Sequence, residues 1–277
     1  VQNPLVVIAD DRVDWKLGVD YQFTDTFMGY ASISTGYRPG TYNPRPFQAS
    51  QVTAVDAEES TAYEIGFKSD LLNRRLRLNA ALFMTDWETR ILPQGGEECL
   101  LLDLGPPPVF SEVPVGTPDS SPDFRGTNCL DTLKLPATFY VNEPGDIEGL
   151  ELELLYRPTE NWTINAVYGY TSWDSPDIQG DPDILNDTPV FVPEDNWSVG
   201  ASYTANLSGG GTVTPRIDMY GQSRICSQNI DLSSPFPYGS CAAAHELTNI
   251  RVEWMSADAT WRMAVGATNA TDEEYFL

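Results

Sequence analysis

This sequence has few basic residues, almost no histidine and no long apolar run. Its 277 residues include one histidine, His245, and 16 lysines and arginines against 40 aspartates and glutamates, a formal net charge of -24. Such an acidic balance excludes long-range attraction to nucleic acid phosphates. No stretch of about 18 apolar residues occurs, so the sequence predicts no transmembrane helix, although membrane proteins built from strands stay open.

Catalytic signatures are also missing. The sequence has no nucleophile elbow, no phosphate-binding loop and no motif in which its one histidine would act as a base. We therefore predict neither an enzyme activity nor a cofactor. Glu151 and Glu153 are alternate carboxylates of the kind used in acid–base catalysis, but on one strand we interpret them as polar groups that face water or protein.

The four cysteines fall in two local pairs within loop-like sequence. Cys99 and Cys129 are 30 residues apart, and Cys226 and Cys241 are 15 residues apart. No CxxC motif or histidine cluster accompanies them, which favours disulfides in an oxidising compartment over a zinc site. On the loop-entropy model, the shorter bridge would stabilise the fold by roughly 3 kcal/mol.

The residues that are present predict an all-β protein. Glycine and proline number 21 each and aromatic residues make up 11%, a mixture that suits strands joined by turns. In ten segments alternate residues are apolar and uncharged, the two-residue period of a strand; we call these positions the apolar parity. The segments are 15–21, 27–33, 63–67, 76–84, 150–156, 162–170, 197–203, 213–219, 250–254 and 261–265. Pro215 lies on the apolar parity of the eighth, where a bulge or a later strand start is expected.

The connections between these segments alternate strictly between short and long. Short ones lie near 24–26, 69–74, 158–161, 206–211 and 257–260; long ones lie near 37–58, 93–137, 174–193 and 223–246. Aromatic side chains on the apolar parity flank the short turns, as in an interfacial girdle. We predict an antiparallel up-and-down transmembrane β-barrel whose uncharged face contacts lipid and whose charged face lines the lumen. A soluble sandwich with an apolar core shows the same alternation and stays an alternative.

Four blocks of the sequence together resemble the TonB-dependent outer-membrane receptors. They are "YASISTGYRPGTYNPRP" (30–46), "AYEIGFKSDLLNRRLRLNAALFMTDWETRI" (62–91), "GLELELLYRPTENWTINAVYGYT" (149–171) and "NATDEEYF" (269–276). The resemblance implies a barrel of about 22 strands in a Gram-negative outer membrane. Residues 1–277 would form one partial barrel domain of about ten strands, with short periplasmic turns and long extracellular loops, and without the plug domain and the last strand.

The resemblance also implies a function and partners. Such receptors import scarce nutrients with energy from a TonB-type inner-membrane complex; a ferric siderophore is the first expectation here, with cobalamin or an oligosaccharide as alternatives. Outer-membrane lipids, lipopolysaccharide and the plug would be further partners. The rival interpretations are a passive porin or adhesin-type barrel and a secreted soluble β-sandwich binding module.

The stretch "STGYRPGTYN" at the looped rim is the first candidate for ligand binding. Tyr37 and Tyr42 offer stacking surfaces, and Arg38 offers a bidentate donor for carboxylate or catecholate oxygens. Alternatively, the three residues only fix the base of the loop.

A second candidate is the acidic loop "DSPDIQGDPDILND" (174–187). Asp177, Asp181 and Asp183 supply oxygen atoms of the kind that hold calcium, although their spacing is not that of an EF-hand. The alternative is an acidic loop that is only solvated.

Overall fold

The computed structural model describes residues 11–43, 54–103, 109–112, 132–174, 184–185, 192–226, 230–231 and 241–275, with backbone alone for the strand residues within 93–139, 184–185 and 230–231. The chain divides into two compact units. The sheet unit comprises Trp15–Ser34, Thr61–Asp86 and Asp146–Leu277, and the loop unit comprises Val1–Asp14, Thr35–Ser60 and Trp87–Gly145.

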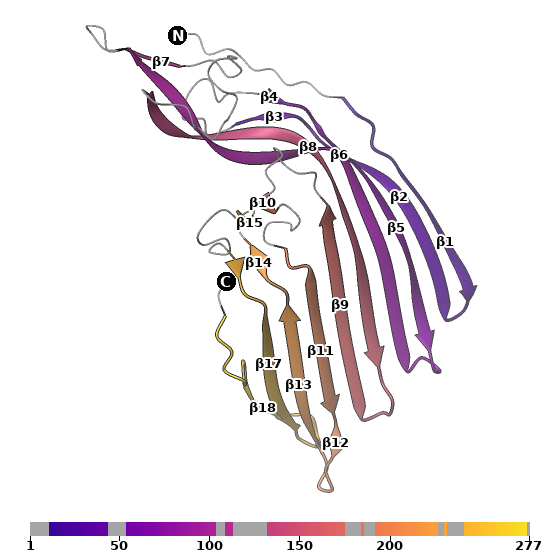
Figure 1. Ribbon diagram of the computed structural model, residues 1–277. Coiled ribbons are helices and arrows are strands. Elements are labelled where there is room, and N and C mark those ends of the chain that lie inside the picture. Colours follow the sequence, from indigo (N-terminus) through magenta and orange to yellow (C-terminus); the bar gives the residue numbers. More distant parts are fainter. Residues whose placement is uncertain are drawn as a thin grey trace. The chain divides into compact units, whose positions relative to one another are not determined.

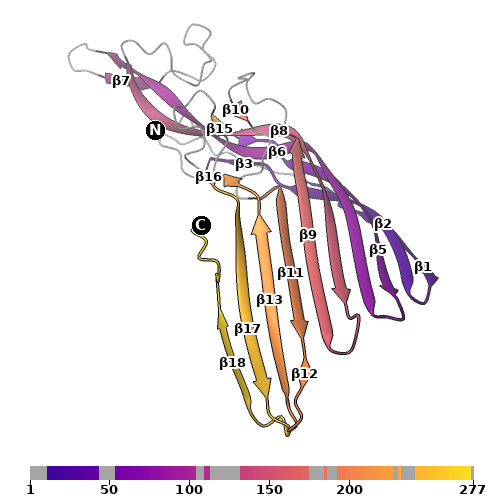
Figure 2. The ribbon, with the colours of Figure 1, turned by 60° about the horizontal axis from the view of Figure 1, so that its bottom comes forward.

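One twelve-stranded sheet follows the order of the chain (Figures 1 and 2). Every strand pair whose register is described is antiparallel. The main path is β1 (Lys16–Thr24), β2 (Phe27–Arg38), β5 (Glu58–Leu71), β6 (Leu76–Asp103), β8 (Thr132–Tyr156), β9 (Trp162–Asp174), β11 (Asp195–Tyr203), β13 (Thr212–Gln222), β17 (His245–Met255) and β18 (Arg262–Ala267). All ten predicted segments are confirmed as strands, and the five short turns are confirmed between them.

Short strands complete the architecture. β7 (Val109–Glu112) pairs with β6, and β12 (Ala205–Asn206) pairs with β13. Three two-stranded pairs lie in the long connections: β3 (Thr41–Tyr42) with β4 (Ala54–Val55), β10 (Ile184–Leu185) with β15 (Ile230–Asp231), and β14 (Ile225–Cys226) with β16 (Cys241–Ala242). Across the part of the chain that the structure describes, no helix has the length and apolarity to cross a membrane.

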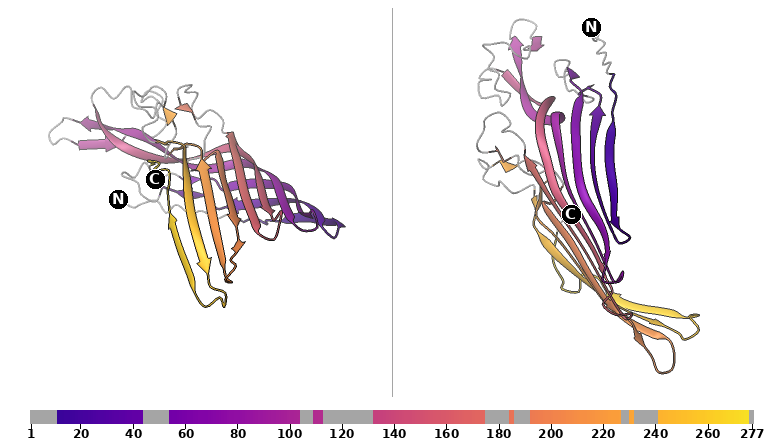
Figure 3. Two further views of the ribbon diagram at one scale, coloured as in Figure 1. Left: turned by 90° about the horizontal axis from the view of Figure 1, so that it is seen from below. Right: turned by 90° about the vertical axis from the view of Figure 1, so that its right-hand side faces the viewer.

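The sheet leaves its apolar face uncovered. In the sheet unit the strands lie in a single layer (Figure 3), and Leu17, Val19 and Val265 are 67%, 65% and 74% exposed. Within the described ranges, only two apolar residues, Ile91 and Cys226, are buried. A soluble sandwich would bury its apolar rows between two stacked sheets. The single layer therefore excludes the sandwich alternative and agrees with a wall that faces lipid.

The two edge strands are exposed along their whole length. β1 pairs with β2 and β18 pairs with β17, and neither has a second partner among the strands that the structure describes. Every residue of both strands is exposed. Because an unpaired backbone edge is prohibitive in lipid, both edges require partner strands, as expected for part of a larger barrel.

Pro215 is accommodated differently from the prediction. β13 begins at Thr212 and pairs with β17 through Pro215 without a register shift, so neither a bulge nor a later start occurs on that side. The interruption lies on the other side, where the ladder with β11 ends at Arg216 and resumes with β12 at Val213. There the hydroxyls of Thr204 and Thr214 are 3.1 Å apart and bridge the gap. Because proline has no backbone N–H to donate, the hydrogen-bond ladder with β11 and β12 is interrupted, whereas the strand itself continues.

The predicted long connection at 93–137 is wrong in part. β6 continues to Asp103 and β8 begins at Thr132, so these strands have 28 and 25 residues. A membrane span needs only about 9–11 residues per strand. Beyond that length the outward side chains no longer need to be apolar, and the alternating pattern that predicts a strand is lost.

The turn between β17 and β18 is closed by one carboxylate. Asp258 accepts hydrogen bonds from Ser256 Oγ at 2.6 Å, from Thr260 Oγ1 at 2.7 Å and from the Thr260 backbone N–H at 3.1 Å. These bonds favour the charged form, and the hydrogen bonds from Ser256 and Thr260 lower the pKa of Asp258 to about 2.

We expect the Asp258 carboxyl to titrate with a pKa near 2 in the folded protein, measured from its carbon chemical shift by NMR. Because this pKa is depressed, the turn is stabilised above the unfolded pKa of roughly 3.9, and the stabilisation is lost as pH falls through the folded value. Ser256→Ala removes the first donor and should raise the pKa of Asp258. An unchanged pKa in that variant would contradict the described hydrogen-bond arrangement.

Candidate functional site

The three predicted ligand-binding residues lie where β2 ends and the β3–β4 pair begins. Tyr37 and Arg38 are the last residues of β2, so their side chains point to opposite faces of the strand. Tyr42 is in β3, and its side chain is 45% exposed. Between them, Gly40 passes so close to the Val55 carbonyl that any Cβ at this position would clash with it. The structure thus places the three residues at one loop base but does not orient them toward one point.

Glu58 ties this loop base to the neighbouring strands. Its Oε2 lies 3.4 Å from Arg38 Nη1 and also accepts the Ile91 backbone N–H at 3.2 Å. The Arg38 side chain stays 58% exposed, whereas that of Glu58 is only 19% exposed. An ion pair this exposed contributes about 0–1 kcal/mol. The guanidinium therefore keeps free surface for a ligand while one carboxylate restrains it.

A buried arginine lies beside Glu58. Arg90 is 7% exposed and belongs to the loop unit, outside the alternating segments that we assign to the membrane. Burial lowers the pKa of Arg90, and the negative charges of Glu143 and Glu58 oppose that effect. Burial raises the pKa of Glu143, and the positive charge of Arg90 opposes it. The two charges thus offset part of each other's cost of burial, and burial remains the larger effect on both pKa values.

Hydrogen bonds between side chains and backbone groups fix the chain just before Glu58. Asn142 accepts the Asp56 N–H at 2.7 Å and donates its Nδ2–H to the Asp56 carbonyl at 3.0 Å. Thr89 Oγ1 donates to the Ala57 carbonyl at 2.7 Å. β5 therefore starts from a backbone that is held by residues of β6 and β8. We name Arg38, Glu58, Arg90, Asn142 and Glu143 the loop-base cluster.

Sequence reasoning identified Arg38 and missed the other four members of this cluster. Asn142 and Glu143 lie close to the predicted connection 93–137, in a stretch without regular alternation. The alternating stretch "WETRIL" (87–92) is the one signal that could have extended the sixth strand to Arg90. Nothing in the sequence shows that Arg90 is buried, because burial depends on the neighbouring strands.

The remaining predicted residues are only partly described. Cys226 and Cys241 form a disulfide and are directly paired in β14 and β16, which confirms that prediction. The side chains of Cys99 and Cys129 lie outside the described residues, and so do Asp177, Asp181 and Asp183. In the ranges that are described, no group of three or more histidine, cysteine or acidic side chains could hold a metal ion.

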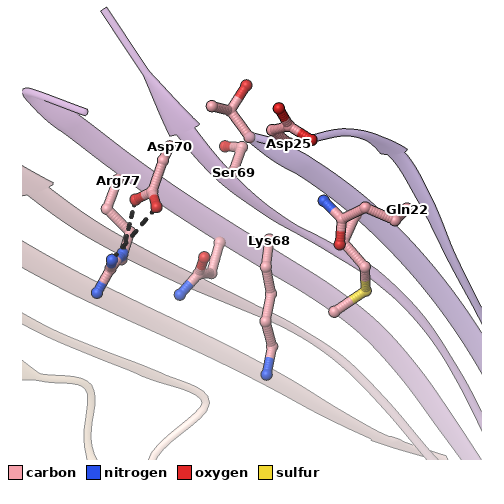
Figure 4. A pocket seen from close by; sticks show the side chains of 9 residues that line it. Gln22, Asp25, Lys68, Ser69, Asp70 and Arg77 are labelled. Atoms are coloured by element: carbon pink, nitrogen blue, oxygen red, sulfur yellow. Dashed lines mark hydrogen bonds and ion pairs between the residues drawn. The ribbon is translucent and has the colours of Figure 1, made fainter. Parts of the chain in front are cut away.

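Among the residues that the structure describes, two recesses on the polar face of the sheet unit are well defined. The short-rim recess, of about 370 Å³, lies next to the β1–β2 and β5–β6 turns and is lined by residues that include Gln22, Lys68 and Ser69 (Figure 4). There Arg77 Nε donates to Asp70 Oδ1 at 2.9 Å, and its Nη2 lies 3.4 Å from Oδ2. The central recess, of about 320 Å³, is lined by Glu64 of β5, Phe83 of β6, Glu151 of β8 and further residues of β1 and β2.

Known proteins share the sequence pattern and the fold. The family model for the TonB dependent receptor-like β-barrel matches residues 5–269. The pesticin receptor of Yersinia enterocolitica is 34% identical over 76 residues, which are 27% of this chain and 11% of the relative. Among solved structures, the ferric yersiniabactin uptake receptor FyuA of Yersinia pestis has a TM-score of 0.62 at 16% identity and covers 94% of this chain.

A second solved structure is also similar in fold over most of this chain. The ferric-catecholate import receptor Fiu of Escherichia coli K12 has a TM-score of 0.59 at 15% identity and covers 95% of this chain. At such identities the likeness shows the fold alone. This chain spans 32% of the FyuA chain and 31% of the Fiu chain.

Proposed function

Because this chain belongs to the family of TonB dependent receptor-like β-barrels, we propose that the whole protein takes up a ferric siderophore across the outer membrane of a Gram-negative bacterium. Uptake would draw energy from a TonB-type complex of the inner membrane. This chain would supply part of the barrel wall and the bases of the extracellular loops.

The segregation of side chains between the two faces of one sheet carries this proposal. In β8 and β9 the uncharged rows are in register, with Leu152 opposite Tyr168 and Leu154 opposite Ala166. The alternate residues Glu151 and Glu153 lie on the other face. A lipid-facing charge costs about 2–4 kcal/mol for Lys or Arg at mid-membrane. One face thus suits hydrocarbon, and the other suits a lumen that contains protein and water.

Iron is the favoured cargo for two reasons. Several of the solved relatives are described as receptors for ferric siderophores. In this chain the exposed Arg38 guanidinium can donate two parallel hydrogen bonds to carboxylate or catecholate oxygens. Cobalamin and oligosaccharides are the alternative cargoes, and the proposed plug and lipopolysaccharide are the remaining partners.

Uptake by the full-length protein tests the proposal. A receptor-deletion strain that carries the full-length gene should accumulate radioactive iron from a ferric siderophore panel, and an inner-membrane uncoupler should abolish the accumulation. Accumulation that survives the uncoupler would identify a passive pore instead. If the strain instead gains growth on cobalamin or glycans and takes up no iron, the transported nutrient would be one of these. The assignment as a receptor would then stand.

Arg38→Ala should weaken ligand binding by about 10- to 150-fold, because a hydrogen bond to a charged group contributes about 1.5–3 kcal/mol and every 1.4 kcal/mol is about tenfold in affinity. Equilibrium titration of the purified full-length receptor measures the effect. Arg157→Ala, which removes an exposed arginine at the opposite, short-turn rim, serves as the matched control.

Glu58→Gln separates binding from anchoring. If Arg38 only anchors the loop through Glu58, Glu58→Gln should weaken binding as much as Arg38→Ala does. If Arg38 contacts the ligand, Glu58→Gln frees the guanidinium and binding should be retained. Affinity equal to wild type in Arg38→Ala would remove this residue from the ligand site.

A further inference from the structure

The basic residues of the short turns are confined to two neighbouring turns of the sheet unit. The β5–β6 turn contains Arg74 and Arg75, and the β8–β9 turn contains Arg157, with Glu160 as the one carboxylate in the two turns. The other short connections contain no lysine or arginine: 25–26, 204–211 and 256–261. The chain as a whole has 16 basic and 40 acidic residues. Two turns of opposite sign to that balance attract anions to one position on this rim.

The two turns are in direct contact. β6 and β8 are neighbours in the sheet, and the Arg157 backbone N–H donates to the Arg75 carbonyl at 2.7 Å. Arg75 Nη1 donates to the Pro158 carbonyl at 3.4 Å. The nearby Asp70 carboxylate is already paired with Arg77, whose Nε lies 2.9 Å from it. All three turn arginines are exposed, and none of them forms an ion pair with the residues that the structure describes.

The backbone of the β5–β6 turn is strained. Leu72, Asn73 and Arg74 have φ of 52°, 57° and 65°, in the left-handed region that is costly for residues with a Cβ. The β11–β13 connection adopts positive φ with Gly210 and Gly211 instead, where this cost is absent. Strain of this kind is concentrated at ligand clamps and active sites. The β5–β6 turn keeps side chains where glycine would be less strained, which indicates that these side chains do more than connect two strands.

Apolar and aromatic neighbours place the arginines at the level of lipid headgroups. Leu71 lies on the apolar parity of β5, and both Leu71 and Leu72 are exposed. Tyr156 and Trp162 lie at the two ends of the β8–β9 turn, and Arg157 directly follows Tyr156. Aromatic rings at the ends of membrane strands mark the boundary between hydrocarbon and headgroups. The turn arginines therefore lie just beyond that boundary.

We propose that Arg74, Arg75 and Arg157 bind the phosphodiester headgroup of an anionic phospholipid in the periplasmic leaflet of the outer membrane, while Leu71 and Leu72 contact its acyl chains. This inference goes beyond the proposed function, because it depends on the barrel and its short periplasmic turns and holds for any cargo. The site fixes one sector of the barrel rim to the lipid around it.

Charge and chemistry both favour this occupant. A guanidinium presents parallel N–H donors that match two oxygens of a phosphate, and the three arginines belong to turns that are in contact. A zwitterionic phospholipid also carries an ammonium, which the arginines repel, so an anionic headgroup is preferred. Free phosphate can accept the same hydrogen bonds, but it gains nothing from the exposed leucines. Acyl chains cover those leucines and remove their surface from water.

Native mass spectrometry of the full-length receptor tests the proposal by titration with phosphatidylglycerol, phosphatidylethanolamine and inorganic phosphate. The test variant is Arg74→Gln with Arg75→Gln. The control variant, Arg251→Gln with Arg262→Gln, also removes two cations, but both already pair with Glu253, at 2.6 Å and 3.2 Å. Each arginine near an anionic headgroup contributes about fivefold in affinity, so the test variant should bind phosphatidylglycerol about 30-fold more weakly. The control should behave as the wild type.

Ionic strength and another variant supply further readouts. Salt should weaken phosphatidylglycerol binding to the wild type, because it screens the charges, and should have little effect on the test variant. If the test variant does not fold, Arg157→Gln replaces it and should weaken lipid binding about fivefold. Affinity for the siderophore should not change in either variant, because neither changes a residue of the loop base.

Four outcomes overturn the proposal. They are wild-type phosphatidylglycerol affinity in the test variant, an equal loss in the control, equal affinity of the wild type for phosphatidylglycerol and phosphatidylethanolamine, and displacement of the lipid by inorganic phosphate at equal concentration. The last would identify a site for free phosphate.

The remaining outcomes concern uptake. If the test variant loses uptake and keeps its lipid affinity, the arginines contact a periplasmic protein instead and the proposal is wrong. If the wild type takes up no ferric siderophore but the test variant still loses lipid affinity, the cargo assignment fails and the lipid site stands.

Discussion

Val199→Arg is expected to lower the free energy of unfolding of the full-length barrel by about 2–4 kcal/mol, the cost of a cation on the lipid face near mid-membrane. Val199 lies near the middle of β11, paired with Ala166 on one side and Met219 on the other. Its side chain is on the uncharged, exposed face. An arginine there has no carboxylate in the apolar row to pair with and must reach toward the interface.

Ser198→Arg is the matched control for this effect. Ser198 is the preceding residue of β11 and faces the polar side of the sheet. The same charge there should change the unfolding free energy far less. Urea unfolding in lipid vesicles, followed by tryptophan fluorescence, measures both variants. If the two were equally destabilising, or Ser198→Arg the worse, the assignment of the faces would have to be reversed.

Gly149→Ala is expected to destabilise the barrel by about 1–3 kcal/mol, the usual cost of overpacking. A Cβ at this position would collide with the Phe83 ring and with the Tyr170 carbonyl. The ring could rotate away, but the carbonyl belongs to the neighbouring strand β9. Relief of that contact therefore requires a shift of the ladder between β8 and β9, which are in register from Asp146 to Tyr156.

Gly18→Ala provides the comparison within a strand. A Cβ at Gly18 would meet Ser32 Cβ at 3.6 Å and the Ala31 carbonyl at 3.7 Å, which are ordinary contacts. This variant should be neutral or more stable by about 0.4–1 kcal/mol, because alanine restricts the unfolded chain. The two alanine variants are compared by the same unfolding measurement. Equal stability of both would show that Phe83 and β9 move without cost.

Several features of the wall could be predicted from the sequence because they are local or periodic. A side-chain period of two places Leu150, Leu152 and Leu154 on one face whatever the neighbouring strands do. The alternation of short and long connections gives the antiparallel order. Cys226 and Cys241 could be paired for a similar reason, because they are close in sequence within the connection between β13 and β17.

One error arose where the membrane no longer imposes a pattern, and a second arose at a proline within a strand. β6 and β8 extend past the span, where outward side chains can be polar, so the segment 93–137 appeared to be a loop. Pro215 was expected to distort its own strand, but the lost hydrogen bond is confined to the β11–β12 side. Neither outcome depends on composition, because both are set by partner strands.

The sequence by itself determined the strands, their order and which face of each is free of charge, since the alternation along a strand requires no knowledge of its neighbours. Only the tertiary structure decided which charges find partners. Arg216 and Arg251 each have a carboxylate two residues away on the same face, whereas Glu64 and Glu151 meet in a recess across an intervening strand. Contacts of that second kind depend on register and sheet order, which no local pattern encodes.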